Sequence, residues 1–136
     1  KKHPAGVIDC ELQCSTTVIN MHEEWLRRIL QHLLQNARKN IPKQRVIKRI
    51  IIRSVINDSG VEVQVEDNGS GIPVEILPKL FYERIEKKNN ELGGFGLMLV
   101  GFLVEQHGGK PKVFWNRPGE GACVGFTIPV GEGHLD

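Results

Sequence analysis

One long stretch of the chain repeats apolar residues at helical spacing. Asn20 is the expected N-cap of this helix, and Glu23 and Glu24 would oppose the helix dipole in its first turn. Asn40 and Pro42 end the pattern. The apolar positions, spaced to fall on one face, are Trp25, Leu26, Ile29, Leu30, Leu33, Leu34 and Ala37.

Stretches of alternating or Ile- and Val-rich residues predict strands before and after this helix. The turn at residues 57–60, between two such stretches, indicates an antiparallel hairpin. Pro111 is at an allowed position for the start of a strand. Strands are expected over residues 7–13, 17–19, 46–57, 61–65, 112–115 and 123–129.

Two further helices complete the pattern. Pro73 suits the start of a short helix over 74–79, and an apolar helix over 95–107 is closed by Gly108 and Gly109. The polar residues between them predict a loop. The order, roughly βαββααββ, indicates an α/β sandwich in which helices pack on one face of a mixed, mostly antiparallel sheet of about five strands.

Length and composition limit the classes of protein. At 136 residues and 15.3 kDa the chain is expected to form a single domain over 1–136. A net charge of +2 gives no reason to expect nucleic acid as a partner. No apolar run approaches membrane-spanning length, and residues 1–6 do not form a signal peptide. We therefore expect a cytoplasmic domain, either free or as the cytoplasmic part of a membrane-bound protein, that makes no membrane contact itself.

The cysteines do not indicate a metal site. Cys10, Cys14 and Cys123 include no CxxC pair, and no second Cys or His pair completes a zinc site. We expect free thiols, which fit a reducing compartment.

The first candidate for chemistry is a polar face of the long helix. His32, Asn36 and Lys39 are four and three residues apart, so they share one face. A carboxamide oxygen is a suitable hard ligand for Mg²⁺, and a nearby lysine can meet phosphate oxygens. A solvated polar stripe would give the same pattern.

The second candidate follows a predicted strand directly. Residues 67–73 read Asp-Asn-Gly-Ser-Gly-Ile-Pro. Glycines allow positive φ and close approach of a flat ligand, and a carboxylate accepts hydrogen bonds from an exocyclic amine such as that of adenine. An ordinary Asp-Asn-Gly turn is the alternative.

The third candidate is the glycine-rich start of the last helix. Residues 93–97 read Gly-Gly-Phe-Gly-Leu. Backbone N–H groups at a helix N-terminus bind anions, and glycines allow phosphates to approach. The stretch is neither a P-loop nor a convincing Rossmann fingerprint. A flexible hinge is the alternative.

In order and spacing, these segments resemble the GHKL ATPase family of gyrase, Hsp90, histidine kinases and MutL, and within it the sensor histidine kinases. Residues 32–40 look like the N box, 67–73 like the first glycine box, 80–84 like the F box and 93–99 like the second glycine box. The resemblance covers nearly all of residues 7–130. It implies a Bergerat fold that binds ATP between the long helix and a lid over 80–92.

The resemblance also implies roles for single residues near the phosphates. Asn36 would coordinate Mg²⁺ that bridges the phosphates, and Lys39 would contact the phosphate tail. Gly94 and Gly96 would accept phosphates at the last helix.

On the base side, the resemblance implies that Asp67 binds the adenine amine, with Gly69 and Gly71 shaping the pocket. Apolar contact with the base or its wall is expected from Ile72, Leu97 and Phe126.

Two positions depart from the family pattern. His32 stands where histidine kinases usually carry Asn and the hydrolysing branches carry Glu, so either a direct role in phosphoryl transfer or a structural role is open. In the second glycine box, Leu92 falls where the first glycine is common, and Gly93 substitutes for it.

The function implied is that of a protein-histidine kinase catalytic domain, with ATP and Mg²⁺ as cofactors. It would phosphorylate a histidine on a separate dimerisation domain of the parent protein, joined through a linker over 1–6, with a response regulator downstream. His22 only superficially resembles a phosphoacceptor, because it begins the helix that carries Asn36. The alternatives are an anti-sigma-factor-like serine kinase and a degenerate nucleotide sensor without transfer activity.

Overall fold

The computed structural model describes residues 7–12, 21–58, 60–85 and 95–130, the first of these ranges by its backbone alone. Within them, no helix is both long enough and apolar enough to cross a membrane. In chain order the elements are β1 Val7–Leu12, α1 Glu23–Asn40, β2 Arg49–Asn57, β3 Gly60–Asp67, the 3-10 helix η1 Val74–Lys79, α2 Gly96–Gln106, β4 Lys110–Arg117 and β5 Gly121–Ile128.

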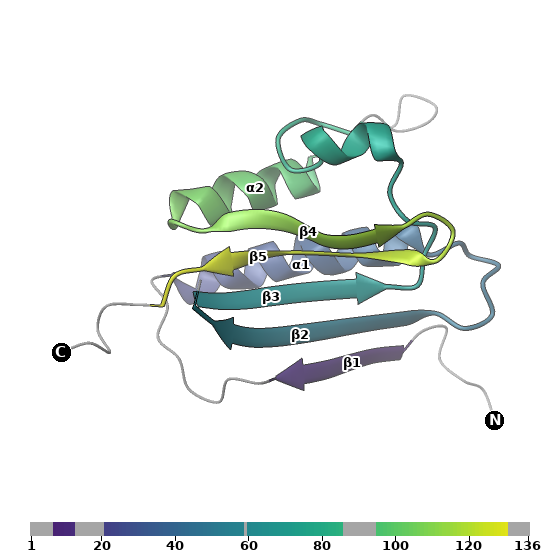
Figure 1. Cartoon of the computed structure of the whole chain (residues 1–136), viewed down its shortest axis with the longest axis horizontal. Helices are drawn as coiled ribbons and strands as arrows, with labels where there is room; N and C mark the ends of the chain where they lie inside the picture. The colour runs from purple at the N-terminus through teal and green to yellow at the C-terminus, as the bar shows by residue number, and fades with distance from the viewer. Residues whose placement is uncertain (1–6, 13–20, 59, 86–94, 131–136) are drawn as a thin grey trace.

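The strands form one mixed sheet of five, in the order β1-β2-β3-β5-β4 (Figure 1). β1 runs parallel to β2, and the other neighbouring pairs are antiparallel. The expected sandwich with a mixed, mostly antiparallel sheet is therefore confirmed. The last two strands are longer than expected, and a bulge between Val113 and Trp115 shifts the register of β4 against β5.

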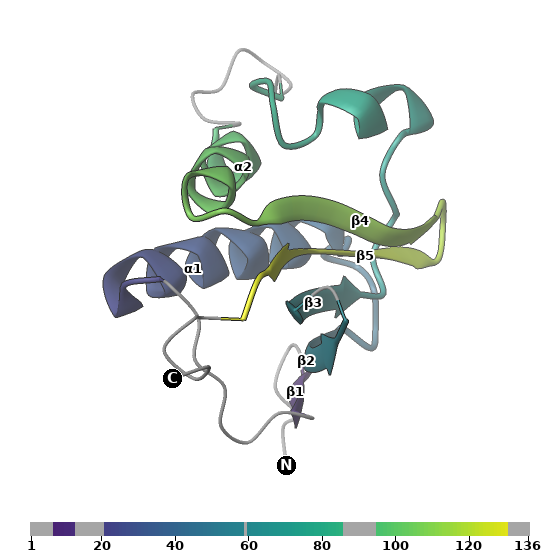
Figure 2. The same cartoon turned by 60° about the vertical axis from the view of Figure 1, so that its left-hand side comes forward.

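Both α-helices pack on the same face of the sheet (Figure 2). α1 buries Ile29, Leu33 and Ala37 against it, which are three of the positions at helical spacing that the pattern selected, whereas Trp25 is exposed. The sheet contributes the alternate residues of β3 and β5 that point to this face, among them Val65 and Phe126. The core therefore lies between the sheet and the two helices.

α1 begins two residues later than expected. Its N-cap is His22 rather than Asn20, and the His22 ring nitrogen Nδ1 accepts a hydrogen bond from the Glu24 N–H at 3.1 Å. A histidine ring nitrogen can satisfy a free N–H of the first turn as a shorter polar side chain does. The role of His22 is therefore that of a helix cap, and the expected end of the helix at Asn40 is confirmed.

β2 begins at Arg49 and not at residue 46. The carboxamide of Asn68 makes two hydrogen bonds to the backbone at the start of β2. Its Oδ1 accepts from the Arg49 N–H at 2.9 Å, and its Nδ2 donates to the Ile47 carbonyl at 2.8 Å. Because these bonds use backbone groups near the start of the strand, residues 46–48 stay outside the ladder. The expected hairpin with β3 is otherwise confirmed.

α2 is fixed at its C-terminus and in its middle. At its C-terminus Gly108 adopts a φ of 82°, and the Gly108 and Gly109 N–H groups bond back to the carbonyls of Glu105 and Val104. In its middle, Gly101 meets the chain after η1: a Cβ there would lie 2.3 Å from the Phe81 carbonyl oxygen.

Two side-chain contacts tie the chain after η1 to α2. The Tyr82 hydroxyl donates to Glu105 at 3.0 Å, and the guanidinium of Arg84 lies 5.3 Å from the centre of the Phe95 ring. Phe81 itself is buried in the core.

Several predictions lie outside the described residues. These are the linker over 1–6, the strand over 17–19, Cys14 and the part of the expected lid beyond Ile85; the side chain of Cys10 is also not described. Cys123 is a buried free thiol, as expected, and burial raises its pKa to about 12.

Candidate functional site

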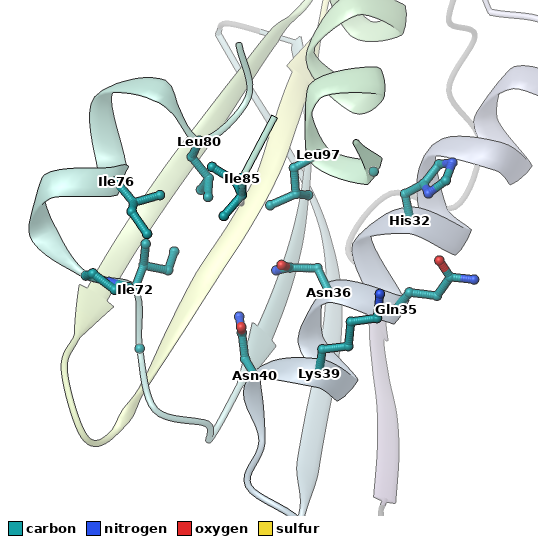
Figure 3. Close-up of a pocket in the computed structure, with 13 residues that line it drawn as sticks. His32, Gln35, Asn36, Lys39, Asn40, Ile72, Ile76, Leu80, Ile85 and Leu97 are labelled. Atoms are coloured by element: carbon teal, nitrogen blue, oxygen red, sulfur yellow. The ribbon is translucent and has the colours of Figure 1, made fainter. Parts of the chain in front are cut away.

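A cavity of about 280 Å³ lies between α1, the start of α2 and the chain around η1 (Figure 3). Its lining combines one polar wall with one apolar wall. The residues that line it are His32, Gln35, Asn36, Lys39, Asn40, Gly71, Ile72, Pro73, Ile76, Leu80, Ile85, Gly96 and Leu97.

The polar wall is one face of α1. Figure 3 shows the carboxamides of Asn36 and Asn40 directed towards the apolar side chains opposite, with His32 farther along the helix. The apolar residues of α1 at the intervening positions pack on the sheet, so the geometry of the helix turns this polar face towards the cavity.

Asn36 carries a polar group that the fold leaves without a partner. Its Nδ2 is buried and has no hydrogen-bond partner within the described ranges. A half-turn of the carboxamide exchanges nitrogen and oxygen, so either can face the cavity. A buried polar atom without a partner is unfavourable, and a ligand in the cavity would supply one.

His32 lies against the start of α2. A Cβ built on Gly96 would be 3.2 Å from Nδ1 of His32, so a glycine allows the ring to approach the helix this closely. Burial, and then the charges of Arg28 and Lys39, lower the pKa of His32 below its ordinary value of 6.5. These effects favour the neutral form of the ring, which lies beside a helix N-terminus.

The apolar wall comes from η1, its flanks and α2. Ile72, Ile76, Leu80, Ile85 and Leu97 face the polar wall across the cavity (Figure 3). This surface suits a flat apolar group.

Ile72 is fixed in this wall by a strand. Its N–H donates to Oδ1 of Asn116 at 2.8 Å, and its carbonyl accepts from Nδ2 of the same side chain at 2.9 Å. Gly71, just before it, has a φ of 82° and packs on Pro118. The chain that leads into η1 is thus anchored to β4.

Asp67 lies at the end of β3 and is only 3% exposed. Its carboxylate accepts hydrogen bonds from the N–H groups of Gly69, at 2.8 Å, and Ala122, and from the side chain of Asn40. Burial nevertheless raises the pKa of Asp67 above its ordinary value, against the opposing effect of these bonds. Since Asn40 lines the cavity, Asp67 lies directly behind it.

Gly69 is needed for this arrangement. A Cβ there would stand 2.4 Å from the carbonyl oxygen of Asn40 and 2.8 Å from Oδ1 of Asp67. The glycine therefore lets α1 and the end of β3 approach each other.

The cavity brings together most of the residues that the sequence selected, and leaves others aside. Asp67 and Gly69 are next to it but do not line it. Phe126 is in the core and does not line it either, because its position on β5 points under the helices. Gly94 lies outside the described residues. The predicted residues in the lining are His32, Asn36, Lys39, Gly71, Ile72, Gly96 and Leu97.

Sequence reasoning missed three kinds of residue at the site. Asn40 is predicted only as the helix end and as the last residue of the N-box-like segment, with no role of its own, although it follows Asn36 by four residues and so shares its face. Ile76 has no signal beyond being apolar next to a loop, and Leu80 enters only as the first residue of the segment that resembles the F box. Asn116 had none at all, because its partner Ile72 is distant in the chain.

The donor set fits a magnesium ion that is shared with a ligand. In the described part of the chain, no three His, Cys, Asp or Glu side chains gather as a metal cage. Mg²⁺ commonly takes few protein ligands and completes its shell with phosphates and water. The carboxamide of Asn36, whose Nδ2 is buried without a partner in the described ranges, is a suitable single ligand of that kind through its oxygen.

Comparison with known families agrees with this geometry. Residues 21–132 match the model of the family described as histidine kinase-, DNA gyrase B-, and HSP90-like ATPase. The chain belongs to this family.

Among curated proteins, the relatives are sensory kinases. The adaptive-response sensory kinase SasA of Parasynechococcus marenigrum (strain WH8102) is 36% identical over 112 residues, which cover 79% of this chain and 28% of the relative. The SasA of Prochlorococcus marinus subsp. pastoris is 30% identical over 130 residues, which cover 93% and 34%. The chain thus spans about a third or less of the length of these relatives.

Solved structures of histidine kinases share the fold. Full-length ShkA in complex with AMPPNP matches with a TM-score of 0.77 at 25% identity, over 93% of this chain and 26% of that one. The catalytic domain of histidine kinase ThkA matches with a TM-score of 0.76 at 25% identity, over 92% and 80%. The mycobacterial sensor histidine kinase MprB matches with 0.70 at 27%, over 90% and 84%.

Proposed function

We propose that this chain binds ATP with Mg²⁺ and acts as the catalytic domain of a sensor histidine kinase. It would transfer the γ-phosphoryl group to a histidine on a separate domain of its parent protein. Sensory and histidine kinases among the relatives and structural neighbours favour this function over that of a serine kinase. The domain would be cytoplasmic, and a response regulator would receive the phosphoryl group next.

The observation that carries the proposal is the polar wall of α1. It presents Asn36, whose Nδ2 lacks a partner in the described ranges, together with Lys39, in the same cavity as Gly96 at the start of α2. An ATPase of this family needs a metal ligand, a cation and a helix N-terminus around the phosphates. The cavity supplies one group of each kind.

On the phosphate side, Asn36 would hold Mg²⁺ and Lys39 would contact the phosphate tail. Gly94 and Gly96 would let phosphate oxygens approach the N–H groups of α2, whose first turn contains no acid. The bound Mg²⁺ would offset phosphate charge during transfer. His32, neutral and beside Gly96, would donate a hydrogen bond to the terminal phosphate or hold a proton there.

On the base side, Asp67 would accept a hydrogen bond from the adenine amine, and Gly69 and Gly71 would shape the pocket. Ile72 and Leu97 would contact the faces of the ring from the apolar wall. Asn40 stands between Asp67 and the cavity and bonds to the carboxylate. The side chain of Asn40 would therefore either rotate away so that the adenine amine reaches Asp67, or bond to both the adenine and Asp67.

In the transfer itself, a neutral imidazole nitrogen of the acceptor histidine would attack the γ-phosphorus. The bond from phosphorus to the bridging oxygen would break as the N–P bond forms, and ADP would leave. The chain's part is to position the nucleotide and exclude water. The linker over 1–6 and the lid over 80–92 stay predictions.

The first test is titration of the chain with ATP in the presence and absence of Mg²⁺. Binding is expected to depend on Mg²⁺ and to be lost in Asn36→Ala and in Asp67→Asn. Binding that is unchanged in both variants would contradict the assignment of the site.

The second test separates kinase from sensor. The chain is incubated with labelled ATP and the phosphoacceptor domain of its parent protein, and acid-labile, base-stable label is expected on histidine. Label on serine would favour the serine-kinase alternative. Binding without transfer would favour a nucleotide sensor.

A further inference from the structure

The loop between α1 and β2 exposes two adjacent aliphatic side chains. Val46 is 93% exposed and Ile47 is 68% exposed. We refer to residues 43–48 as the basic tip; in Figure 1 this connection projects past the end of the sheet. Single exposed aliphatic residues are common. Two neighbours on a projection, with so little contact to the rest of the fold, are not explained by folding.

The tip is held rigidly. Nδ2 of Asn68 donates to the Ile47 carbonyl and Oδ1 of Asn68 accepts from the Arg49 N–H. The Arg45 guanidinium donates to the Asn68 carbonyl, and the Arg45 N–H donates to the Pro42 carbonyl at 3.0 Å. With its backbone bonded on both sides, the tip presents Val46 and Ile47 in a fixed orientation, which lowers the entropy lost on binding.

The small net charge of the chain conceals a strong asymmetry. Residues 25–57 hold half of its 18 Lys and Arg and none of its 16 Asp and Glu. This part of the chain comprises most of α1, the tip and β2. Arg27 pairs with Glu23 and Arg53 pairs with Glu66, so these two cations add little to the field of the stretch. A local excess of one sign attracts anionic surfaces before contact. The cations are Arg27, Arg28, Arg38, Lys39, Lys43, Arg45, Lys48, Arg49 and Arg53.

Cations surround the aliphatic pair in particular. Lys43 and Arg45 precede Val46, while Lys48 and Arg49 follow Ile47. The β4–β5 turn is tied to the same end of the sheet by the bond from the Gly119 N–H to the Ser70 carbonyl. It adds Arg117 and Glu120, which balance each other. The tip therefore combines local positive charge with exposed aliphatic surface.

We propose that the basic tip binds the surface of an anionic lipid bilayer, with Val46 and Ile47 inserted among the head groups. Basic residues next to apolar side chains are the combination that lipid surfaces of this kind attract. A globular protein partner would need a far larger contact area than a projecting tip offers. Nucleic acid would use the cations but not the aliphatic pair.

This contact differs from the sequence-based expectation of no membrane contact. That expectation rested on the absence of a spanning run, and a surface contact needs none. The proposal is independent of the nucleotide site, since none of the residues of the tip lines the cavity.

The test is co-sedimentation of the chain with vesicles of phosphatidylcholine alone or mixed with phosphatidylserine. Binding is expected only to the mixed vesicles and is expected to weaken as salt rises. The double variant Val46→Ser, Ile47→Ser is expected to lose about tenfold or more in affinity. Val74→Ser, at a residue 66% exposed on η1, is the matched control and is expected to bind like the wild type.

Replacing Lys43 and Lys48 by Gln is expected to weaken binding and to flatten its dependence on salt. ATP binding is expected to be unchanged in all of these variants and serves as the check that each one is folded. Equal binding by the double variant and the wild type would overturn the proposal. Capture by polyglutamate or DNA without binding to mixed vesicles would also overturn it, and would assign the tip to a protein or nucleic acid partner.

Discussion

The two sides of the cavity are built in different ways. On the base side, the carboxylate of Asp67 accepts three hydrogen bonds, and Asn116 pairs twice with Ile72. On the phosphate side, Asn36 keeps a buried amide group without a partner within the described ranges. The base side is therefore part of the folded structure, while the phosphate side holds polar groups for a ligand. Changes on the first should reduce stability, and changes on the second should reduce binding.

The largest effect is expected from Gly69→Ala. The new Cβ would stand 2.4 Å from the Asn40 carbonyl oxygen, so α1 and β3 must move apart, at a cost of about 3 kcal/mol. Chemical denaturation measures the loss. Gly108→Ala is the contrasting variant, because it tests backbone strain without close approach: its φ is 82°, whereas Gly69 has no left-handed φ, and nothing lies within 4 Å of a Cβ at Gly108. It should cost about 1 kcal/mol, and an equal loss in both variants would contradict the close-approach explanation.

Next in size is the contrast between Asp67→Ala and Asn36→Ala. Removing the Asp67 carboxylate leaves buried donors without an acceptor, which should cost about 2 kcal/mol of stability as well as affinity. Removing the Asn36 amide should change stability by less than about 0.5 kcal/mol and yet weaken Mg²⁺-dependent ATP binding by about tenfold or more. Denaturation and calorimetric titration of both variants measure the split. A stability loss in Asn36→Ala as large as that in Asp67→Ala would remove the distinction between the two sides.

The pH dependence should differ in sign between the two sides. The pKa of His32 is lowered in the fold, so the stability that it contributes is present above its ordinary pKa of 6.5 and is lost as pH falls through the folded pKa. The pKa of Asp67 is raised, so its contribution is present below the ordinary pKa of 3.8 and is lost as pH rises through the folded pKa.

Unfolding free energies measured across mildly acidic pH test this. Below pH 6.5, His32→Gln is expected to lose less stability than the wild type on acidification. Parallel curves for the two proteins would show that His32 does not titrate differently in the fold.

The smallest effect is expected away from both sides. Tyr82→Phe removes the hydrogen bond to Glu105 at 3.0 Å, which is exposed, and should cost about 0.5 kcal/mol. Glu105→Gln, which keeps an acceptor oxygen, is the milder partner variant. Affinity for ATP should not change in either, and a marked loss in titration would extend the site to Tyr82 and its contact with α2.

The sequence predicted the fold well, because periodicity sets which face of each element is buried. The spacing of Ile29, Leu33 and Ala37 was sufficient to define α1 and its buried face. Boundaries were less accurate where a distant side chain intervened. The side chain of Asn68 bonds to the backbone of Ile47 and Arg49 and keeps residues 46–48 out of β2. No local sequence pattern predicts these two hydrogen bonds.

The polar wall of the site was also predictable, since His32, Asn36 and Lys39 lie on one helical face and the structure places all three in the cavity. Asn40, which screens Asp67 from the cavity, was missed because its bond joins the end of α1 to the end of β3. The charge asymmetry of residues 25–57 can be read from the positions of the charged residues in the sequence, but the net charge of +2 does not reveal it.

The contacts between α2 and the chain after η1 have a consequence for insertions in the connection between them. Gly101 packs on Phe81, and Arg84 lies over the Phe95 ring, so contacts among the described residues hold the two stems of the intervening connection. Closing a connection between fixed stems grows more costly only with the logarithm of its length, by about 0.6 kcal/mol for each doubling. Extra sequence inserted between Ile85 and Phe95 should thus change the free energy of folding little. Such an insertion would begin next to the cavity, because Ile85 is part of its apolar wall.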